Sequence, residues 1–285
     1  MREHRIIKQD LERKDARPDK RLGQHFLLDE YTLQLMVENL ELTPSDYLVE
    51  IGPGTGQLTD FLIGQCRHLT VVEKDPAMTE ILREKHPDLA IIEDDILKTN
   101  WSEFWTDYSG PYTLVGNLPY NITTPILELL VRSADRLKRA VIMVQLEIAQ
   151  RIMARHDSPD YARLSLFIQN YFDVRLIKKV SGRLFYPPTK VQSAVLGLIP
   201  RTQPIIPEDL YPVFYQVVKA AFSQRRKNLN NCLSHYPFFK SVSVPASEVL
   251  SRAGIDGKRR GETLDFTEFE TLARAYRPLI HSPSK

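Results

Sequence analysis

Residues 47–56 read Tyr-Leu-Val-Glu-Ile-Gly-Pro-Gly-Thr-Gly, an apolar run that leads directly into a glycine-rich loop. The run Tyr47–Ile51 predicts a buried strand, and Gln57–Gln65 after the loop predicts a helix. Glycines between a strand and a helix let the chain turn tightly and bring backbone amides close to a nucleotide-like cofactor. Taken alone, the loop fits either a dinucleotide site or an S-adenosylmethionine site.

Strands and helices are expected to alternate around this loop. Apart from Tyr47–Ile51 and Gln57–Gln65, the patterns predict strands at Leu69–Val72, Leu89–Ile92, Tyr112–Val115 and Ala140–Gln145, and helices at Tyr31–Leu42, Pro76 to about Lys85, about Thr123 to Arg132, and from Gln145 through Met153. This alternation is typical of an α/β fold with a doubly wound parallel sheet. Right-handed crossovers would then place the loops after the strands at one edge, where ligands bind.

The pattern changes near Pro200-Arg201 and the prolines at 204 and 207. Beyond them only helical stretches are expected, at roughly Leu210–Phe222, Arg226–Leu233, Ala246–Ala253 and Thr267–Tyr276. We therefore expect a charged N-terminal tail at 1–22, a Rossmann-like domain at 23–202 and a small helical domain at 203–285. Residues 201–285 carry 13 Lys and Arg against 8 Asp and Glu. That excess suits a polyanion such as RNA, although ordinary variation between surfaces would explain it equally well.

The whole chain of 285 residues, with a formal net charge of only +2, is 42% hydrophobic and 26% charged. This composition supports a sizeable core. Two distant cysteines, Cys66 and Cys232, make neither a disulfide framework nor a metal set, so we expect no metal and a reducing cytoplasm. We expect no signal peptide and no membrane span, because the charged N-terminus contains five acids and no apolar run is long enough.

Two carboxylates point to the type of cofactor. Glu73 ends the predicted strand after the loop, 21 residues beyond Gly52, where it could accept the ribose hydroxyls. The loop reads Gly-X-Gly-X-Gly and lacks the Gly-X-Gly-X-X-Gly spacing of a pyrophosphate site. Asp95 follows the third strand, where it could accept a hydrogen bond from an adenine amine. These features favour S-adenosylmethionine over NAD; the alternative for each carboxylate is a solvated strand end.

The tetrapeptide Asn117-Leu118-Pro119-Tyr120 follows the fourth predicted strand. The exocyclic nitrogen of adenine is a weak nucleophile, and acceptors for both amine protons favour a pyramidal nitrogen that can attack a methyl group. Asn117 supplies a side-chain carbonyl and Leu118 a backbone carbonyl, while Pro119 restricts the residue before it and Tyr120 offers a ring for stacking. The pattern predicts a methyltransferase acting on an unpaired or flipped-out nucleic-acid base; a plain turn is the alternative.

Together with Gly23-Gln24-His25-Phe26-Leu27, these residues resemble the ribosomal small-subunit RNA adenine dimethyltransferases of the bacterial KsgA type. The resemblance covers most of the chain and is carried by several motifs in order. They are residues 49–56 (VEIGPGTG), 116–122 (GNLPYNI), 185–191 (FYPPTKV), 193–195 (SAV) and 222–227 (FSQRRK). The resemblance implies a class I methyltransferase fold and N6,N6-dimethylation of two adjacent adenines in a hairpin loop near the 3′ end of small-subunit rRNA.

The resemblance also implies site residues. The cofactor would be contacted by His25, Leu27, Gly52, Glu73, Asp95 and Asn117. Tyr120 and Phe185 would hold the target adenine between their rings, with Asn117 serving both amine and cofactor. His25 stands where many relatives have Asn; its neutral imidazole can still form a hydrogen bond, and its titration near neutrality would make cofactor binding more sensitive to pH.

Basic clusters suggest how RNA would be bound. Residues 175–190 contain five bases (Arg175, Lys178, Lys179, Arg183 and Lys190) and no acid, and two further clusters are Arg225-Arg226-Lys227 and Lys258-Arg259-Arg260. Such clusters would supply salt-dependent phosphate contacts, although any one of them is as readily a solvated face. We expect a monomer that acts on small-subunit rRNA in the immature subunit.

Three rival functions stay open. A large-subunit rRNA adenine methyltransferase of the antibiotic-resistance type shares the fold and the Asn-X-Pro-Tyr motif, and 224–227 with 185–195 favour the small-subunit type. A mainly non-catalytic ribosome-assembly factor would bind without methylating. A NAD oxidoreductase is disfavoured by the loop spacing.

Overall fold

The computed structural model describes residues 2–14, 17–19, 22–99, 101, 108, 110–240 and 242–280, with side chains from residue 7 onward. The chain divides into two compact units, one formed by Met1–Ala149 with Asp173–Pro200 and the other by Gln150–Phe172 with Arg201–Lys285. Compactness thus assigns residues 150–172, which the sequence pattern places in the first domain, to the helical second unit. Each unit is described by itself.

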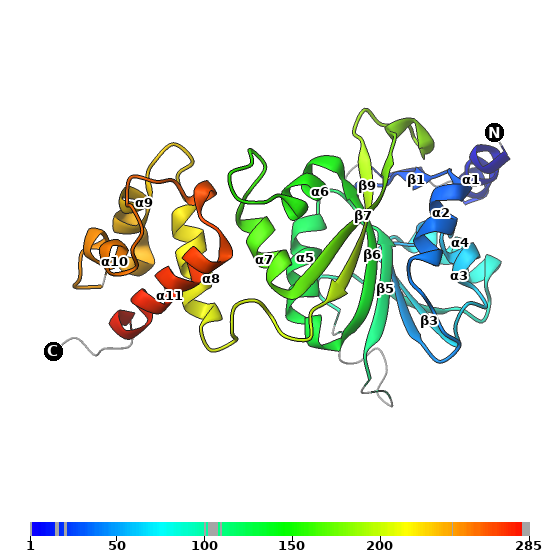
Figure 1. The fold of residues 1–285 in the computed structure, drawn as a ribbon. Helices are drawn as coiled ribbons and strands as arrows, with labels where there is room; N and C mark the ends of the chain where they lie inside the picture. The colour runs from blue at the N-terminus through cyan, green and yellow to red at the C-terminus, as the bar shows by residue number, and fades with distance from the viewer. Residues whose placement is uncertain are drawn as a thin grey trace. The chain divides into compact units, whose positions relative to one another are not determined.

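The first unit is built on a seven-stranded sheet (Figure 1). In spatial order the strands are β4 (Ala90–Glu93), β3 (His68–Glu73), β2 (Tyr47–Ile51), β5 (Tyr112–Asn117), β6 (Leu137–Gln145), β9 (Ser193–Pro200) and β7 (Phe172–Val180). The pairs from β4 to β6 are parallel, and the strand order reverses direction between β2, the first strand of this sheet in the chain, and β5. The parallel part therefore has the expected doubly wound topology.

The far end of the sheet differs from the expectation. Strand β9 pairs antiparallel with β6, from Ala140↔Leu198 to Gln145↔Ser193, and β7 lies at the edge beyond it. The expectation of a purely parallel sheet is therefore wrong at this end. Neither β7 nor β9 was expected, because the apolar residues of β7 are interrupted by Arg175, Lys178 and Lys179. Basic residues on an edge strand are a usual protection against pairing with another chain.

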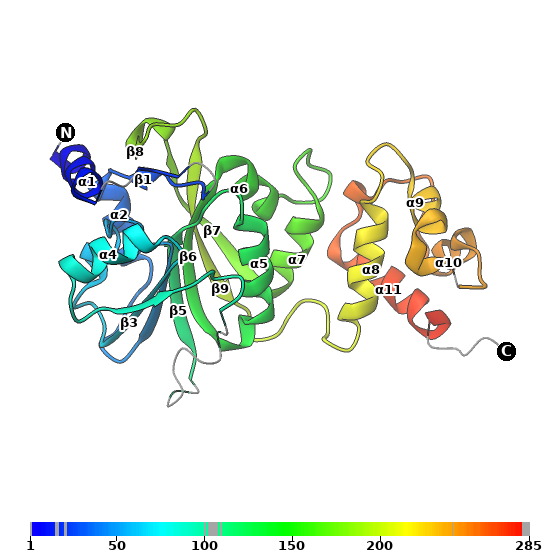
Figure 2. The ribbon, with the colours of Figure 1, turned by 180° about the vertical axis from the view of Figure 1, so that it is seen from behind.

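Helices cover both faces of the sheet. Helix α2 (Glu30–Glu38) covers one face in Figure 1, and α5 (Thr123–Arg132) covers the other face, which is turned forward in Figure 2. Helix α4 (Pro76–Lys85) lies on the α2 side, because the right-handed crossover from β3 to β4 runs opposite to the one from β5 to β6. The core on the α2 side contains fully buried residues from α2, from the turn after it and from the sheet, among them Met36, Leu40, Val115, Val141 and Val195. The remaining helical elements of this part are α3 (Thr59–Leu62), α6 (Leu146–Met153), which continues into the second unit, η2 (Ala134–Arg136) and η3 (Gly182–Leu184).

Two N-terminal segments pack against other parts of the first unit. The charged segment expected to be a tail contains helix α1 (Arg2–Arg13), whose Ile7 and Leu11 are buried against Met78 and Ile81 of α4. Lys14 forms ion pairs with Glu80 and Glu84. Strand β1 (Phe26–Leu27) then pairs antiparallel with β8 (Phe185–Tyr186) in a separate two-stranded sheet.

The second unit is helical where the structure describes it. It contains α7 (Arg163–Tyr171), α8 (Tyr211–Ala221), α9 (Leu229–His235), α10 (Ala246–Arg252), α11 (Phe266–Ile280), η4 (Pro237–Phe239) and η5 (Gly261–Thr263). Its core is centred on α8 and α11, where Phe214 and Phe269 are fully buried. Asn170, also fully buried, accepts the Ile206 N–H through Oδ1 at 2.7 Å. This bond joins α7 to the segment between Pro200 and Pro207, and Leu166 of α7 is buried in the same core. Both contacts place α7 in the second unit.

Candidate active site

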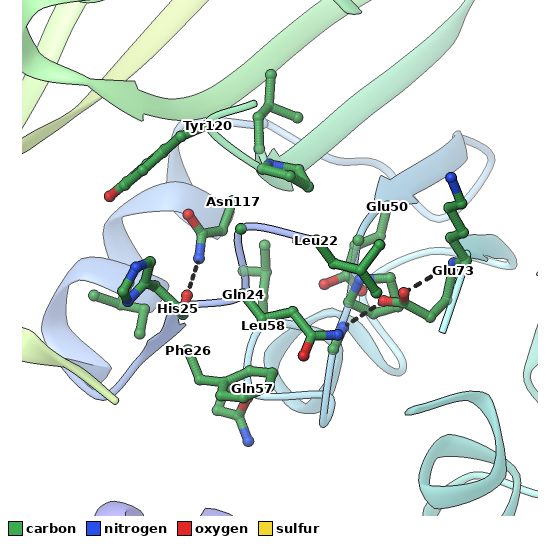
Figure 3. A pocket seen from close by; sticks show the side chains of 18 of the residues that line it. Leu22, Gln24, His25, Phe26, Glu50, Gln57, Leu58, Glu73, Asn117 and Tyr120 are labelled. Carbon is green, nitrogen blue, oxygen red and sulfur yellow. Dashed lines mark hydrogen bonds between the residues drawn. The ribbon is translucent and has the colours of Figure 1, made fainter. Parts of the chain in front are cut away.

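A pocket opens at the carboxyl ends of β2 and β5, at the reversal of strand order where α/β sheets bind ligands. It is enclosed by the glycine loop, the segment around β1 and the residues after β5 (Figure 3). The lining residues are Leu22, Gly23, Gln24, His25, Phe26, Leu27, Leu33, Glu50, Gly52, Pro53, Gly54, Gln57, Leu58, Glu73, Lys74, Asn117, Leu118, Pro119, Tyr120 and Ile122. Eight of the ten predicted site residues are therefore brought together; Asp95 and Phe185 are the two others.

The glycine loop needs its glycines for conformation and for space. Gly52, Gly54 and Gly56 have φ values of +65°, +59° and +89°, a region that L side chains rarely adopt. A Cβ on Gly54 would come within 2.7 Å of the Phe26 ring. The loop and β1 are thus packed against each other, and the floor of the pocket is backbone.

Glu73 ends β3 and is only 7% exposed. Its Oε2 accepts the Gly54 N–H at 3.0 Å, and its Oε1 accepts the N–H groups of Lys74 and Asp75 at 2.8 and 2.9 Å. Burial raises the pKa of Glu73, and these three N–H groups act in the opposite direction. Three donors on four lone pairs leave Oε2 one position, so the carboxylate has room for one ribose hydroxyl without losing a bond.

Glu50 is a pocket residue that the sequence interpretation did not identify. It is fully buried at the end of β2 and lines the pocket beside Glu73, and the Thr59 hydroxyl donates to its Oε2 at 2.7 Å. Burial raises the pKa of Glu50 to about 8. An acidic residue two positions before the first loop glycine could have pointed to it, but its place inside the apolar run Tyr47–Ile51 made it look like strand interior.

The Asn117 side chain has a defined orientation. Its Nδ2 donates to the His25 backbone carbonyl at 2.8 Å (Figure 3). Because the amide nitrogen faces a carbonyl, the side-chain oxygen Oδ1 must point the other way, and it lies on the side of Tyr120. Leu118 is buried, and its N–H donates to the Met143 carbonyl at 3.0 Å, which ties the tetrapeptide to β6. Asn117 is therefore held as a hydrogen-bond acceptor.

Tyr120 is a half-buried ring with two neighbours. Its hydroxyl shares a hydrogen bond with the Ser193 hydroxyl at 2.6 Å, and its ring stacks on His25 with centroids 5.9 Å apart. Burial raises the pKa of Tyr120. His25 Nδ1 lies 2.9 Å from the Pro187 carbonyl oxygen, so Nδ1 carries the hydrogen of that bond.

Asp95 and Phe185 lie elsewhere. Asp95 Oδ2 is 3.0 Å from Lys74 Nζ, and Asp95 Oδ1 accepts the Leu97 N–H. Burial, the largest single influence, would raise the pKa of Asp95. The Lys74 ammonium and the Leu97 N–H outweigh it together, so the pKa of Asp95 is lowered. The Phe185 side chain is 1% exposed and belongs to the core under α2. A base could reach Phe185 only after the side chain moved.

The pocket fits S-adenosylmethionine by its donor and acceptor chemistry. Two buried carboxyl groups, Glu50 and Glu73, face a small space, and burial of such groups is unfavourable without a ligand or hydrogen bonds that compensate it. A ligand with a positive charge and ribose hydroxyls would provide that compensation. Among the described residues, no cluster of His, Cys, Asp or Glu has the arrangement of a metal site.

The basic clusters differ in how free their charges are. Lys178 Nζ is bound to Asp29 Oδ2 at 2.8 Å and Thr32 Oγ1 at 2.7 Å, and Arg259 is paired with Glu268. By contrast, Arg225, Arg226 and Lys227 in the second unit are exposed, and so is Lys258, although Arg225 Nη2 donates to the Pro159 carbonyl at 3.4 Å. The 225–230 segment lies beside 257–259, because the Leu229 and Asn230 N–H groups donate to the carbonyls of Arg259 and Gly257. No helix within the described part of the chain has the length and apolarity that crossing a membrane requires.

The chain matches known proteins over most of its length. The family model for ribosomal RNA adenine dimethylase matches residues 16–272. A ribosomal RNA small subunit methyltransferase A from Syntrophotalea carbinolica is 39% identical over 92% of this chain and 98% of its own, and one from Prosthecochloris aestuarii is 37% identical over 91% and 94%.

Solved structures agree on the fold. A dimethyladenosine transferase from Plasmodium falciparum superimposes with a TM-score of 0.75 at 24% identity, covering 89% of this chain and 98% of its own. The 23S rRNA methyltransferase ErmE superimposes with a TM-score of 0.65 at 28% identity, covering 88% and 98%. The predicted class I methyltransferase fold is therefore confirmed, and the chain belongs to the ribosomal RNA adenine dimethylase family.

Proposed function

We propose that this protein is an S-adenosylmethionine-dependent rRNA adenine N6,N6-dimethyltransferase of the small ribosomal subunit. The observation that carries the proposal is the orientation of Asn117. Its Nδ2 is occupied by the His25 carbonyl, so Oδ1 is available to accept a hydrogen bond from an amine beside the Tyr120 ring. An acceptor next to an aromatic ring, in a pocket that also holds Glu73, suits a flat base with an exocyclic amine.

The residues of this pocket would bind and orient the base. Asn117 Oδ1 accepts one amine proton and the Leu118 carbonyl the other, which draws electron density to the nitrogen and aims its lone pair. The Tyr120 ring fixes the plane of the adenine by stacking. S-adenosylmethionine, when bound, supplies an electrophilic methyl group. Catalysis then rests on positioning and electrostatics, with no strong base required.

Cofactor binding is assigned to His25, Leu27, Gly52, Glu73, Asp95 and Asn117. Five of these line the pocket. Asp95 keeps one acceptor position on each oxygen beside its bonds to Lys74 and the Leu97 N–H, and it would use one of them for the adenine amine of the cofactor. Phe185 would form the second ring around the target adenine after leaving the core.

The RNA substrate follows from the family and from charge. The closely similar curated relatives are small-subunit methyltransferases, and we assign the reaction to two adjacent adenines in a hairpin loop near the 3′ end of small-subunit rRNA, within the immature subunit. Arg225, Arg226 and Lys227 supply exposed cations for phosphate contacts that depend on salt. We further propose that a monomer acts in the cytoplasm, with residues 23–202 as the catalytic domain and 203–285 as the RNA-binding domain.

One experiment separates this function from its rivals. Labelled S-adenosylmethionine is supplied with immature small subunits, large subunits or duplex DNA, and Asn117→Ala serves as the control. Dimethyladenine in the small subunit alone, absent with the variant, is the expected result. Label in large-subunit RNA would indicate the resistance type represented by the ErmE fold neighbour. Binding of small subunits without any transfer would indicate an assembly factor.

A further inference from the structure

Ser193 is a buried hydroxyl residue for which the site described above has no role. It is the first residue of β9, it is fully buried, and it pairs with Gln145 at the end of β6. The Leu146 N–H donates to the carbonyl of Gln192 at 2.8 Å, which extends the pairing one residue further. Ser193 is thus fixed at the start of β9, a strand that lies between β6 and β7 in the seven-stranded sheet.

The Ser193 hydroxyl meets the outer end of Tyr120. The two hydroxyl oxygens are 2.6 Å apart, and 73 residues of chain separate them. Tyr120 itself lies in the turn after β5 and lines the pocket. Its ring is therefore attached at two ends, by its own backbone and by β9, and His25 stacks against it at an interplanar angle of 28°.

We propose that Ser193 is a positioning residue for methyl transfer: it fixes the plane of the Tyr120 ring on which the target adenine stacks. This inference rests on the proposed function, because it takes Tyr120 as the stacking ring. A tyrosine held only at Cα can turn about two side-chain bonds, and each turn would tilt a stacked adenine and move its amine away from Asn117. A hydrogen bond from a rigid strand removes that freedom before the base arrives.

Holding the ring should affect rate more than RNA affinity. Most of the affinity for a polyanion comes from phosphate contacts, which lie outside this pocket. The orientation of the amine decides how often the bound complex reaches a reactive geometry. A net hydrogen-bond contribution of about 1 kcal/mol corresponds to a change of about five- to tenfold. We therefore expect the loss of the Ser193–Tyr120 bond to lower kcat by about that factor, with little change in KM for RNA.

The test compares Ser193→Ala, Tyr120→Phe and the double variant, because both single changes remove the same bond. Ser165→Ala is the matched control: Ser165 is also fully buried and its hydroxyl donates to the Arg151 carbonyl at 2.5 Å, in the second unit. Measurements are kcat and KM with immature small subunits, affinity for S-adenosylhomocysteine, and thermal unfolding. Asn117→Ala in the same assay tests the proposed function separately.

Support requires equal losses of kcat in Ser193→Ala and Tyr120→Phe, no further loss in the double variant, and unchanged affinity for S-adenosylhomocysteine. Ser165→Ala should lower thermal stability alone. Full kcat in Ser193→Ala, while Asn117→Ala is inactive, would overturn the inference and leave the proposed function standing. Additive losses would overturn it too, since the hydroxyls would then act apart. If Ser193→Ala does not fold, full kcat in Tyr120→Phe decides against it. Activity retained in Asn117→Ala would overturn both.

Discussion

Replacing Asn117 by aspartate tests how the adenine amine is held. The aspartate side chain has the same shape and keeps an acceptor oxygen, and it loses the N–H that now donates to the His25 carbonyl at 2.8 Å. A carboxylate oxygen would instead face that carbonyl oxygen, and the two repel. An acceptor left without its donor in a partly buried site costs about 1–3 kcal/mol. If that energy holds the side chain in its reactive orientation, the rate falls by about 5- to 150-fold at pH 8.

The rate of Asn117→Asp should depend on pH. A protonated carboxyl group can donate to the His25 carbonyl with its O–H and still accept the amine proton with its other oxygen. Partial burial and the facing carbonyl both favour that protonated form. The rate of Asn117→Asp relative to wild type should therefore rise as the pH falls from 8 to 6, whereas the relative rate of Asn117→Ala stays low throughout.

The assay measures initial rates of labelled methyl transfer to immature small subunits across this pH range, for wild type and both variants. Circular dichroism at each pH confirms that the variants are folded. Wild-type activity of Asn117→Asp at pH 8 would show that the bond to His25 does not orient the acceptor. A constant ratio between the aspartate and alanine variants at all pH values would refute the reasoning on protonation.

Three further predictions concern stability. Between its ordinary pKa of 4.5 and about 8, Glu50 is protonated in the folded protein and ionised in the unfolded chain, so the free energy of unfolding should fall as the pH rises through this window. Burial raises the pKa of Glu73 as well, so Glu50→Gln should make this slope shallower without abolishing it, in urea titrations at pH 5, 6.5 and 8. Gly54→Ala should lower the free energy of unfolding by about 1–2 kcal/mol through its positive φ, and further through the clash of the new Cβ with the Phe26 ring. Adding Phe26→Leu to Gly54→Ala should relieve only the clash, measured by thermal unfolding. Asn170→Ala should lose about 1–3 kcal/mol in urea titrations, because it leaves the Ile206 N–H buried and unpaired.

Local patterns were sufficient to predict the parallel half of the fold. Strand β2 has the predicted bounds Tyr47–Ile51, because a short apolar run ends abruptly at glycine. Helix α4 begins at Pro76 as predicted: Asp75 caps it by accepting the Ala77 N–H, and proline fits the first turn. These signals lie within a few residues of the element that they define, so the sequence alone contains them.

Such local signals could not predict the antiparallel end of the sheet. Strand β9 is apolar enough to be a strand, but its pairing with β6 joins residues about fifty positions apart, as in Gln145↔Ser193. The edge strand β7 has no clean alternation, because cations take several of its positions. Helix α3 is shorter than expected for a local reason that the pattern did not reveal, since Ile63 leaves the helical conformation and Gly64 has a φ of +79°.

The same distinction between local and long-range information applies to the site. Motifs identified which residues matter, and eight of the ten lie together, but motifs do not fix orientation. The direction of the Asn117 amide is set by the carbonyl of His25, 92 residues away, and Asp95 is engaged by Lys74, which no motif includes. Phe185 shows the limit most clearly, because its neighbours in sequence match the family while its side chain lies in the core.

The antiparallel end of the sheet therefore contributes to the site. An Asn-X-Pro-Tyr turn after a parallel strand supplies an amide and a ring, and in isolation both would rotate. In this protein His25, the residue just before β1, supplies the carbonyl that orients the amide, and β9 supplies the hydroxyl that meets the ring. β1 is itself held by pairing with β8, and residues 187–192 join β8 to Ser193 at the start of β9. If the same turn followed a parallel strand in a sheet that lacked β1 and β9, we would expect cofactor binding at the glycine loop to be unchanged and the target adenine to be held poorly.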